Sequence, residues 1–296
     1  MKTRIAGLFF SISCLALLLP TAFGGEGATK PMRKTVRAED GLNIVCEVRG
    51  KGDTTLVFLH GWCGDHEYWK HQVDVFATDY RLVTLDQAGH GESGKGRKSW
   101  SFSSLASDVE SVAKALDLRR VILIGHSMGG LVALMAAKRM PDIVIAVIGV
   151  DTIQNVELKI PEDFKKPFLE GFRSDFKGAT RKGFPGYLPE KADPELKKWL
   201  VTKAEEQDPK MAVGLLRDLL YLDMKMLLKD AKKPVRCINS GGPYPFYTPT
   251  ATAINKKYAD YGALLIDGVG HYPMLEKPAE FNQKLRLVLQ EFAAKR

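Results

Sequence analysis

The chain has 296 residues, 45% of them hydrophobic, and its 43 lysine and arginine residues exceed its 35 aspartate and glutamate residues. That length is sufficient for one large α/β domain with an insertion. The basic residues are spread over many segments and lack the interleaved aromatic residues of a nucleic-acid-binding stripe. They therefore indicate a solvated surface, and no nucleic-acid partner is expected.

Residues 1–24 have the pattern of a signal peptide. Lys2 and Arg4 form a basic start, residues 5–19 are nearly all apolar, and small residues follow at Ala22 and Gly24. The alternative is a membrane anchor, but the apolar run is shorter than the ~20 residues needed to span a bilayer. The segment is predicted to be cleaved, which gives an exported protein, periplasmic or secreted, without stable membrane insertion.

Three cysteines follow the predicted signal peptide, Cys46, Cys63 and Cys237. The odd number excludes complete pairing within one chain. A disulfide between Cys46 and Cys63 and buried free thiols are both open alternatives. No C-x-x-C or His/Cys spacing suggests a metal ligand set, so no metal ion is expected.

Short apolar segments alternate with helical ones from residue 32 onward. Residues 32–38 and 42–49 flank an Asp-Gly turn, which favours a hairpin. Continuous apolar runs predict buried strands at 55–59, 81–85, 121–124 and 143–150. The segments between and after them predict helices near 69–76, 102–116 and 131–140. This alternation predicts an α/β fold with a mostly parallel sheet and helices on both faces.

The alternation stops between residues 152 and 232, which are predicted to form a helical lid. Four phenylalanines recur there at every fourth residue, which indicates a helical face: Phe164, Phe168, Phe172 and Phe176. Further amphipathic helices follow, and residues 183–189 indicate an irregular loop. The lid would separate a first part of the core, residues 25–151, from a second, residues 233–296.

The second part of the core completes the predicted sheet. Strands are expected at 235–239 and 263–266, and a closing helix that begins with proline at 278–293. Together with the six earlier strands they give an eight-stranded sheet. Ligands of such sheets bind at the carboxyl ends of the strands, and His60, Asp86, Ser127 and Asp151 all follow strand ends.

The sequence Gly-His-Ser-Met-Gly at residues 125–129 lies between a predicted buried strand and a predicted helix. In that context G-x-S-x-G is typical of a nucleophile elbow, a tight turn that exposes the serine hydroxyl. Ser127 is therefore the candidate nucleophile. A serine needs a base, and His271, in a glycine-flanked loop after the last strand, is expected at the same edge of the sheet. His126 is expected to point away from the serine.

Four motifs relate the chain to a known family: HGW at 60–62, DQAGHGES at 86–93, GHSMGG at 125–130 and GVGHYPMLEKPAEF at 268–281. With them the chain resembles the α/β-hydrolase superfamily, specifically its lidded, esterase- or lipase-like serine hydrolases. The resemblance implies Ser127 as nucleophile, His271 as general base and then general acid, and no cofactor. It implies an oxyanion hole formed by the backbone N–H groups of Trp62 and Met128.

The expected substrate pocket consists of His60, Trp62, Tyr272 and Met274, with His60 also bracing its own loop. The aromatic and apolar side chains in this set, together with the lid phenylalanines, favour an apolar acyl or alcohol group.

A serine hydrolase of this family also needs an acidic residue that orients the histidine and completes a Ser–His–acid triad. The position of this acid departs from the family pattern. Members of the family commonly carry it in the loop after the strand that corresponds to residues 235–239, but residues 240–246 contain no carboxylate. Some members carry it after the preceding strand, which here ends in Asp151. Asp151 is therefore the predicted acid, whereas Asp86 is expected to brace a loop and Asp267 precedes His271 too closely to reach its far nitrogen.

The sequence thus predicts a serine hydrolase that cleaves a small to medium, apolar carboxylic ester through an acyl-enzyme on Ser127. A serine at this position is unlike the carboxylate nucleophile of the related dehalogenases and epoxide hydrolases. Alternatives on the same triad are a C–C bond hydrolase, an acyltransferase or an amidase. A catalytically inactive binding protein is a further alternative, because the usual acid loop lacks a carboxylate.

Overall fold

The computed structural model describes residues 31–293, so the predicted signal peptide lies outside the described residues. At its centre is one eight-stranded sheet in the order β1-β2-β4-β3-β5-β6-β7-β8. β2 runs antiparallel to β1 and β4, and all other neighbours are parallel. The strands are β1 Met32–Arg37, β2 Asn43–Arg49, β3 Thr55–Leu59, β4 Arg81–Leu85, β5 Val121–His126, β6 Val144–Val150, β7 Val235–Ser240 and β8 Tyr261–Ile266. The predicted fold class is confirmed.

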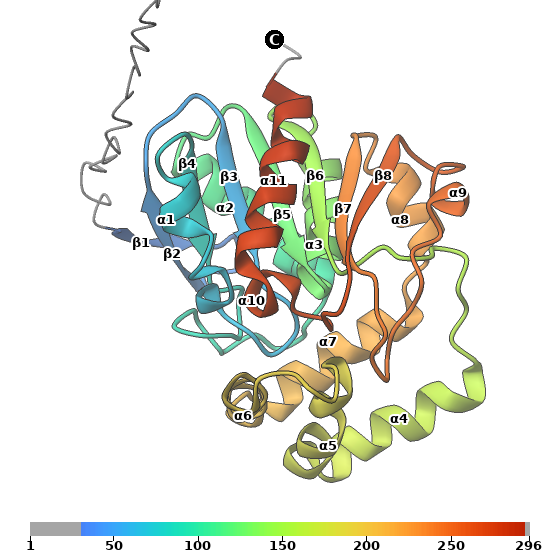
Figure 1. The fold of residues 1–296 in the computed structure, drawn as a ribbon. Helices are drawn as coiled ribbons and strands as arrows, with labels where there is room; N and C mark the ends of the chain where they lie inside the picture. The colour runs from blue at the N-terminus through green and yellow to red at the C-terminus, as the bar shows by residue number, and fades with distance from the viewer. Residues whose placement is uncertain (1–30, 294–296) are drawn as a thin grey trace, which may run out of the picture.

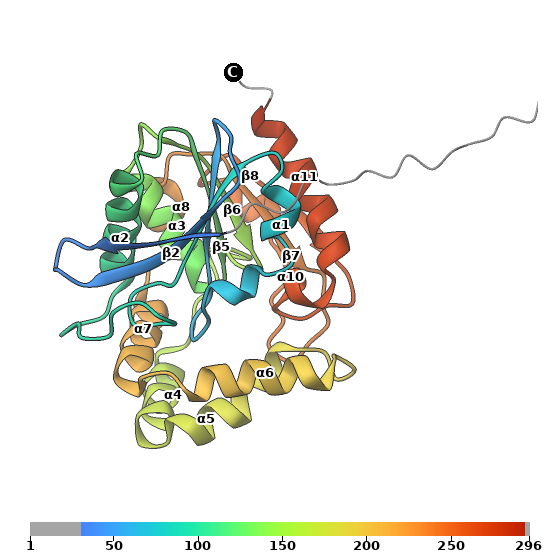
Figure 2. The same cartoon turned by 90° about the vertical axis from the view of Figure 1, so that its left-hand side faces the viewer.

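Helices cover both faces of the sheet (Figures 1 and 2). One face carries α2, α3 and α8, and the other carries α1 and α11. Because both faces are covered, the central strands β3 and β5 are buried along their whole length, which explains their continuous apolar sequences. The covering helices are α1 Val73–Phe76, α2 Phe102–Ala115, α3 Met128–Arg139, α8 Met224–Asp230 and α11 Pro278–Ala293.

The helix predicted near residues 69–76 is instead two short helical segments. A 3₁₀ turn, η1 His66–Trp69, begins at the capping side chain of Asp65, and α1 follows after Gln72. The Gln72 side chain is buried and donates to the Met274 carbonyl and to Asn282 Oδ1. These tertiary hydrogen bonds fix the connection between the two segments, which local sequence periodicity does not reveal.

The segment 152–232 contains the helices α4 to α8, and α4 to α7 lie together beyond the carboxyl ends of the strands (Figures 1 and 2). Its last helix, α8, packs against α3 and therefore lies with the core. The sequence 183–189 contains a 3₁₀ turn, η2, where an irregular loop was expected. The remaining helices of the segment are α4 Glu162–Ser174, α5 Phe176–Gly183, η2 Phe184–Tyr187, α6 Pro194–Glu205 and α7 Pro209–Tyr221.

The phenylalanine series of the segment is divided between two helices. Phe164, Phe168 and Phe172 lie on α4, which ends at Ser174. The next residue, Asp175, accepts a hydrogen bond from the Gly178 N–H and caps α5. Phe176 therefore begins the next helix. Its ring still contacts Phe172, with ring centroids 6.2 Å apart.

Cys46, Cys63 and Cys237 are free and buried. Of the two open alternatives, the structure therefore shows buried free thiols and no disulfide among the described residues. Within residues 31–293 no helix is both long enough and apolar enough to cross a membrane.

Two leucines on α11 provide a test of how this helix packs on the sheet. Leu285 is 0% exposed and Leu287 is 58% exposed. Leu285→Ala is expected to lower the free energy of unfolding by about 2 to 5 kcal/mol because it leaves a cavity, measured by urea denaturation. The matched control Leu287→Ala is expected to change it by less than about 0.5 kcal/mol. Equal effects would contradict the observed packing.

Candidate active site

Ser127 lies at the tight turn between β5 and α3. Its backbone has φ 51° and ψ −119°, a conformation that a residue with a Cβ adopts only under strain. The flanking glycines are required for space, because a Cβ at Gly125 would overlap the Gly129 backbone and one at Gly129 would overlap the Leu59 and His60 carbonyls. The serine hydroxyl does not cap α3. The turn therefore has the geometry of a nucleophile elbow.

Asp151 and His271 form a short hydrogen bond at the same edge of the sheet. Asp151 directly follows β6, is 2% exposed, and its Oδ2 lies 2.6 Å from His271 Nδ1. Its Oδ1 accepts from the Ser240 N–H at 2.9 Å. Burial alone would raise the pKa of Asp151, but hydrogen bonds from His271, the Ser240 N–H and Tyr244 lower it below its usual value. The carboxylate is therefore ionised and holds the Nδ1–H of the imidazole.

Because Nδ1 of His271 is bound to Asp151, Nε2 is the ring nitrogen that can accept the proton of the Ser127 hydroxyl. Among the described residues no hydrogen bond joins it to the Ser127 hydroxyl. In serine enzymes such contacts commonly tighten only when substrate is bound. The structure thus brings the three predicted residues to one edge of the sheet, with the acid–histidine contact already formed.

The loop that carries His271 is fixed by backbone hydrogen bonds. The His271 N–H donates to the Tyr187 carbonyl at 2.7 Å, and the N–H groups of Gly270 and Tyr272 donate to the Glu276 carboxylate at 2.8 to 3.0 Å. The ring of Tyr187 is stacked on the imidazole, with centroids 5.0 Å apart. The histidine is therefore held from η2 on one side and from its own loop on the other.

His126 takes part in holding this loop. Its Nε2 lies 2.8 Å from the His271 carbonyl, and the two rings are 4.8 Å apart. Burial lowers the pKa of His126 well below its usual value, and the neighbouring His271 adds to the effect. A neutral His126 with its proton on Nε2 donates to that carbonyl. It therefore supports the predicted base.

The residues expected to form an oxyanion hole flank the serine. Met128 is the first residue of α3, so its N–H lies at the positive end of the helix dipole. Gly61 packs closely against the elbow, since a Cβ there would lie 3.2 Å from the Ser127 Cβ and would overlap the His126 ring. The next N–H along the chain belongs to Trp62.

The Trp62 side chain connects this loop to the helices beyond the sheet edge. Its Nε1 donates to the Ala212 carbonyl of α7 at 2.8 Å, and its ring is stacked on Phe184 with centroids 5.9 Å apart. It also lines an apolar cavity of ≈ 510 Å³ between α4, α5 and η2. The aromatic residues of the cavity wall are Trp62, Phe164, Phe168, Phe172, Phe184, Tyr187 and Phe246.

Three of the four predicted pocket residues do not line this cavity. His60 is 0% exposed, and its Nε2 accepts from the Gln87 N–H, so it braces its loop as the resemblance implied. Tyr272 and Met274 are 3% and 0% exposed and pack into the core. Proximity in sequence to His271 does not place a side chain in the pocket, because the loop turns those side chains inward. Asp86 accepts from His66 and from the Glu92 N–H, as expected for a loop brace.

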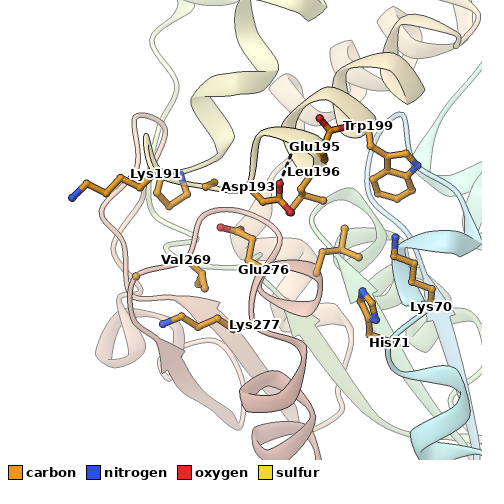
Figure 3. A pocket seen from close by; sticks show the side chains of 14 residues that line it. Lys70, His71, Lys191, Asp193, Glu195, Leu196, Trp199, Val269, Glu276 and Lys277 are labelled. Carbon is orange, nitrogen blue, oxygen red and sulfur yellow. Dashed lines mark hydrogen bonds between the residues drawn. The ribbon is translucent and has the colours of Figure 1, made fainter.

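A second hollow, of ≈ 620 Å³, has Val269 and Glu276, which precede and follow His271 in the chain, in its wall (Figure 3). Its wall includes Lys70, Lys191 and Lys277 together with Asp193 and Glu195. None of the three candidate catalytic residues lines either hollow, but Trp62 and Tyr187, which adjoin the serine turn and His271, line the apolar cavity and not this one. Residues 31–293 contain no group of His, Cys, Asp and Glu residues arranged to hold a metal ion.

Two tyrosines beside the acid–histidine pair were missed at the sequence level. Tyr187 lies in the segment expected to be an irregular loop, and Tyr244 lies in the loop that lacks a carboxylate. The Tyr244 hydroxyl donates to Asp151 Oδ2 at 2.8 Å. The only signal for Tyr244 in the sequence is that it occupies the loop where the family commonly carries its acid.

Comparison with known proteins establishes the family. Residues 56–284 match the model of the alpha/beta hydrolase family, and the chain belongs to this family. The dihydrolipoyllysine-residue acetyltransferase component of the acetoin cleaving system of Pseudomonas putida is 37% identical over 118 residues, 40% of this chain and 32% of that protein. A non-heme chloroperoxidase of Streptomyces lividans is 35% identical over 128 residues, 42% of this chain and 46% of that protein. The chain thus spans less than half of either relative.

An esterase from Exiguobacterium antarcticum has the same fold. The two structures superpose with a TM-score of 0.79 over 88% of this chain and 100% of the esterase, at 19% sequence identity. At that identity the similarity concerns the fold alone.

The strained backbone at Ser127 predicts that a glycine variant at this position is more stable than an alanine variant. Ser127→Gly is expected to have a free energy of unfolding about 1 kcal/mol higher than Ser127→Ala, because glycine adopts the elbow conformation without strain. The matched pair Ser107→Gly and Ser107→Ala, within α2, is expected to show the opposite order by about 0.5 to 1 kcal/mol. Thermal or urea denaturation measures both. The same order at both positions would contradict a strained elbow.

Proposed function

We propose that the protein is a serine hydrolase of small to medium carboxylic esters with an apolar acyl or alcohol group. The observation that carries the proposal is the hydrogen bond between the buried Asp151 Oδ2 and His271 Nδ1 at the sheet edge where the elbow presents Ser127. A serine hydroxyl becomes an effective nucleophile at neutral pH when an oriented histidine accepts its proton. The pair supplies that orientation.

Acylation of the enzyme is the first half of the reaction. Ser127 Oγ attacks the ester carbonyl carbon while His271 Nε2 accepts the hydroxyl proton, and the Asp151 carboxylate stabilises the resulting imidazolium. The negative charge on the carbonyl oxygen is held by the N–H groups of Met128 and Trp62. The C–O bond to the alcohol then breaks, and His271 returns the proton to the leaving oxygen. The product is an acyl-enzyme and a free alcohol.

Deacylation repeats these steps with water as the nucleophile. His271 Nε2 removes a proton from water, the hydroxide oxygen attacks the acyl carbon, and the same two N–H groups hold the second oxyanion. The bond to Ser127 Oγ breaks and His271 returns the proton to the serine. The carboxylic acid leaves, and the enzyme is restored.

The apolar cavity supports the choice of substrate. Trp62 and Tyr187 both line it, and each also belongs to the reaction site: Trp62 through its backbone N–H and Tyr187 through its ring on His271. A group bound among these aromatic side chains would therefore lie beside the loops that carry the candidate oxyanion donor and the candidate base. The shared fold with an esterase agrees with this proposal.

The triad is tested by removing the charge of its acid. Asp151→Asn is expected to lower kcat/KM for a p-nitrophenyl ester by about 10³ to 10⁴, because the amide cannot stabilise the imidazolium. The matched control is Asp267→Asn, an exposed aspartate just before the histidine loop, which is expected to keep activity within about twofold. A loss of less than tenfold in folded Asp151→Asn would contradict the assignment of the acid.

Labelling with a fluorophosphonate separates the proposal from its alternatives. An adduct on Ser127 together with turnover of p-nitrophenyl esters is expected. Turnover confined to amides or to C–C substrates, or acyl transfer to an added alcohol in preference to water, would identify the alternative reactions. Absence of any adduct in folded protein would favour a binding protein.

The cavity is tested by removing one of its aromatic walls. Phe168→Ala is expected to lower kcat/KM for p-nitrophenyl octanoate roughly tenfold because apolar contact is lost, with little change for the acetate. Tyr221→Ala is the matched control, since Tyr221 is half-exposed on α7 and does not line the cavity. Equal effects on both esters, or the same change in the control, would contradict an apolar subsite at this position.

A further inference from the structure

We infer that Tyr244 is a positioning residue for the Asp151–His271 pair: its hydroxyl fixes the carboxylate and withdraws part of its negative charge. The inference rests on the proposed serine-hydrolase triad. It assigns a role to the loop after β7, which lacks the carboxylate that the resemblance led us to expect there. The acid is supplied from β6, and the loop after β7 supplies a donor to it.

The geometry concentrates two donors on one oxygen. Asp151 Oδ2 accepts from His271 Nδ1 at 2.6 Å and from the Tyr244 hydroxyl at 2.8 Å, while Oδ1 accepts from the Ser240 N–H at 2.9 Å. Tyr244 is 8% exposed and Asp151 is 2% exposed, so water competes little for these bonds. All three donors converge on a carboxylate whose own backbone has a positive φ of 43°. The carboxylate is thus oriented from three sides.

The Tyr244 hydroxyl is neutral near pH 7 and donates to Asp151. Burial and the neighbouring Asp151 carboxylate raise the pKa of Tyr244 well above its usual value. The loop that carries it is fixed, because the Gly242 N–H donates to Ser240 Oγ and the Tyr247 N–H donates to the Tyr244 carbonyl. The hydroxyl is therefore presented to Asp151 by a rigid segment.

The consequence concerns the strength of the acid–histidine contact. A carboxylate oxygen that already accepts one hydrogen bond is a weaker acceptor for a second, so Tyr244 limits how strongly Asp151 holds the imidazolium. Without Tyr244 the carboxylate would retain the protonated histidine more strongly and would also be less precisely oriented. Removal of the hydroxyl should therefore raise the pH at which His271 loses its proton. It should also slow turnover, because the carboxylate is less precisely oriented.

Other titratable groups also face this pair, from the elements packed around it. They are His126 of β5, Tyr187 of η2, Cys237 of β7 and Glu276, the last residue of the short helix α10 Pro273–Glu276. Burial raises the pKa of Tyr187 to about 12 and that of Cys237 to about 12, so both are neutral near pH 7. Glu276 and the neutral His126 are present in the wild type and in both variants, so they affect His271 equally in all three proteins. The difference between variants thus isolates the hydroxyl of Tyr244.

The experiment compares Tyr244→Phe with Tyr261→Phe. The Tyr261 hydroxyl is also buried, but it donates to the Ile153 carbonyl and makes no contact with Asp151, so its removal is a matched control. In Tyr244→Phe the midpoint of the acidic limb of kcat/KM is expected to move upward by about 0.5 to 1 pH unit. We also expect kcat to fall about 3- to 10-fold at nearly constant KM. Tyr261→Phe should retain the wild-type midpoint.

An NMR titration of the His271 imidazole makes the same comparison without relying on turnover. The resonance is assigned by its loss in His271→Gln, and its midpoint should rise in Tyr244→Phe and not in Tyr261→Phe. An unchanged midpoint in folded Tyr244→Phe, by either method, would overturn the inference. Failure of the wild type to label with fluorophosphonate would instead overturn the proposed function, while the NMR comparison would still decide the role of Tyr244.

Discussion

The arrangement of the site depends on one contact, the hydrogen bond from His271 Nδ1 to the buried Asp151 Oδ2. A buried carboxylate is costly unless its charge is balanced by hydrogen bonds, and here the donors come from β7, from the loop after β7 and from the histidine loop. The strands that carry these groups are neighbours in the sheet. Sheet order is therefore what allows an acid on β6 to serve a histidine that follows β8.

The same edge of the sheet joins the site to the helices above it. Trp62 donates from its side chain to α7, and the His271 N–H donates to the Tyr187 carbonyl of η2. The α4–α7 segment is thus hydrogen-bonded both to the loop that contributes a candidate oxyanion donor and to the loop of the candidate base. Movement of these helices would therefore alter the position of both loops.

Most of the fold could be predicted from the sequence because its signals are local. Each signal depends only on residues nearby in the chain, as for the apolar strands, the glycines of the elbow and the proline that begins α11. The predicted eight-stranded sheet is confirmed. The structure also places Ser127, Asp151 and His271 at one edge, although their catalytic roles stay predictions. The pocket could not be predicted, because which way Tyr272 and Met274 face depends on tertiary packing. Tyr244 was missed because its partner lies 93 residues away in the chain.

The central claim is that Asp151 acts through His271 in activating Ser127, and a double-mutant comparison tests it most directly. kcat/KM for a p-nitrophenyl ester would be measured in Asp151→Asn, His271→Ala and the double variant. If the acid acts only through the histidine, the double variant should be no slower than His271→Ala alone, as is typical of residues that act together. Losses that multiply in the double variant would contradict the claim, because Asp151 would then act independently of His271.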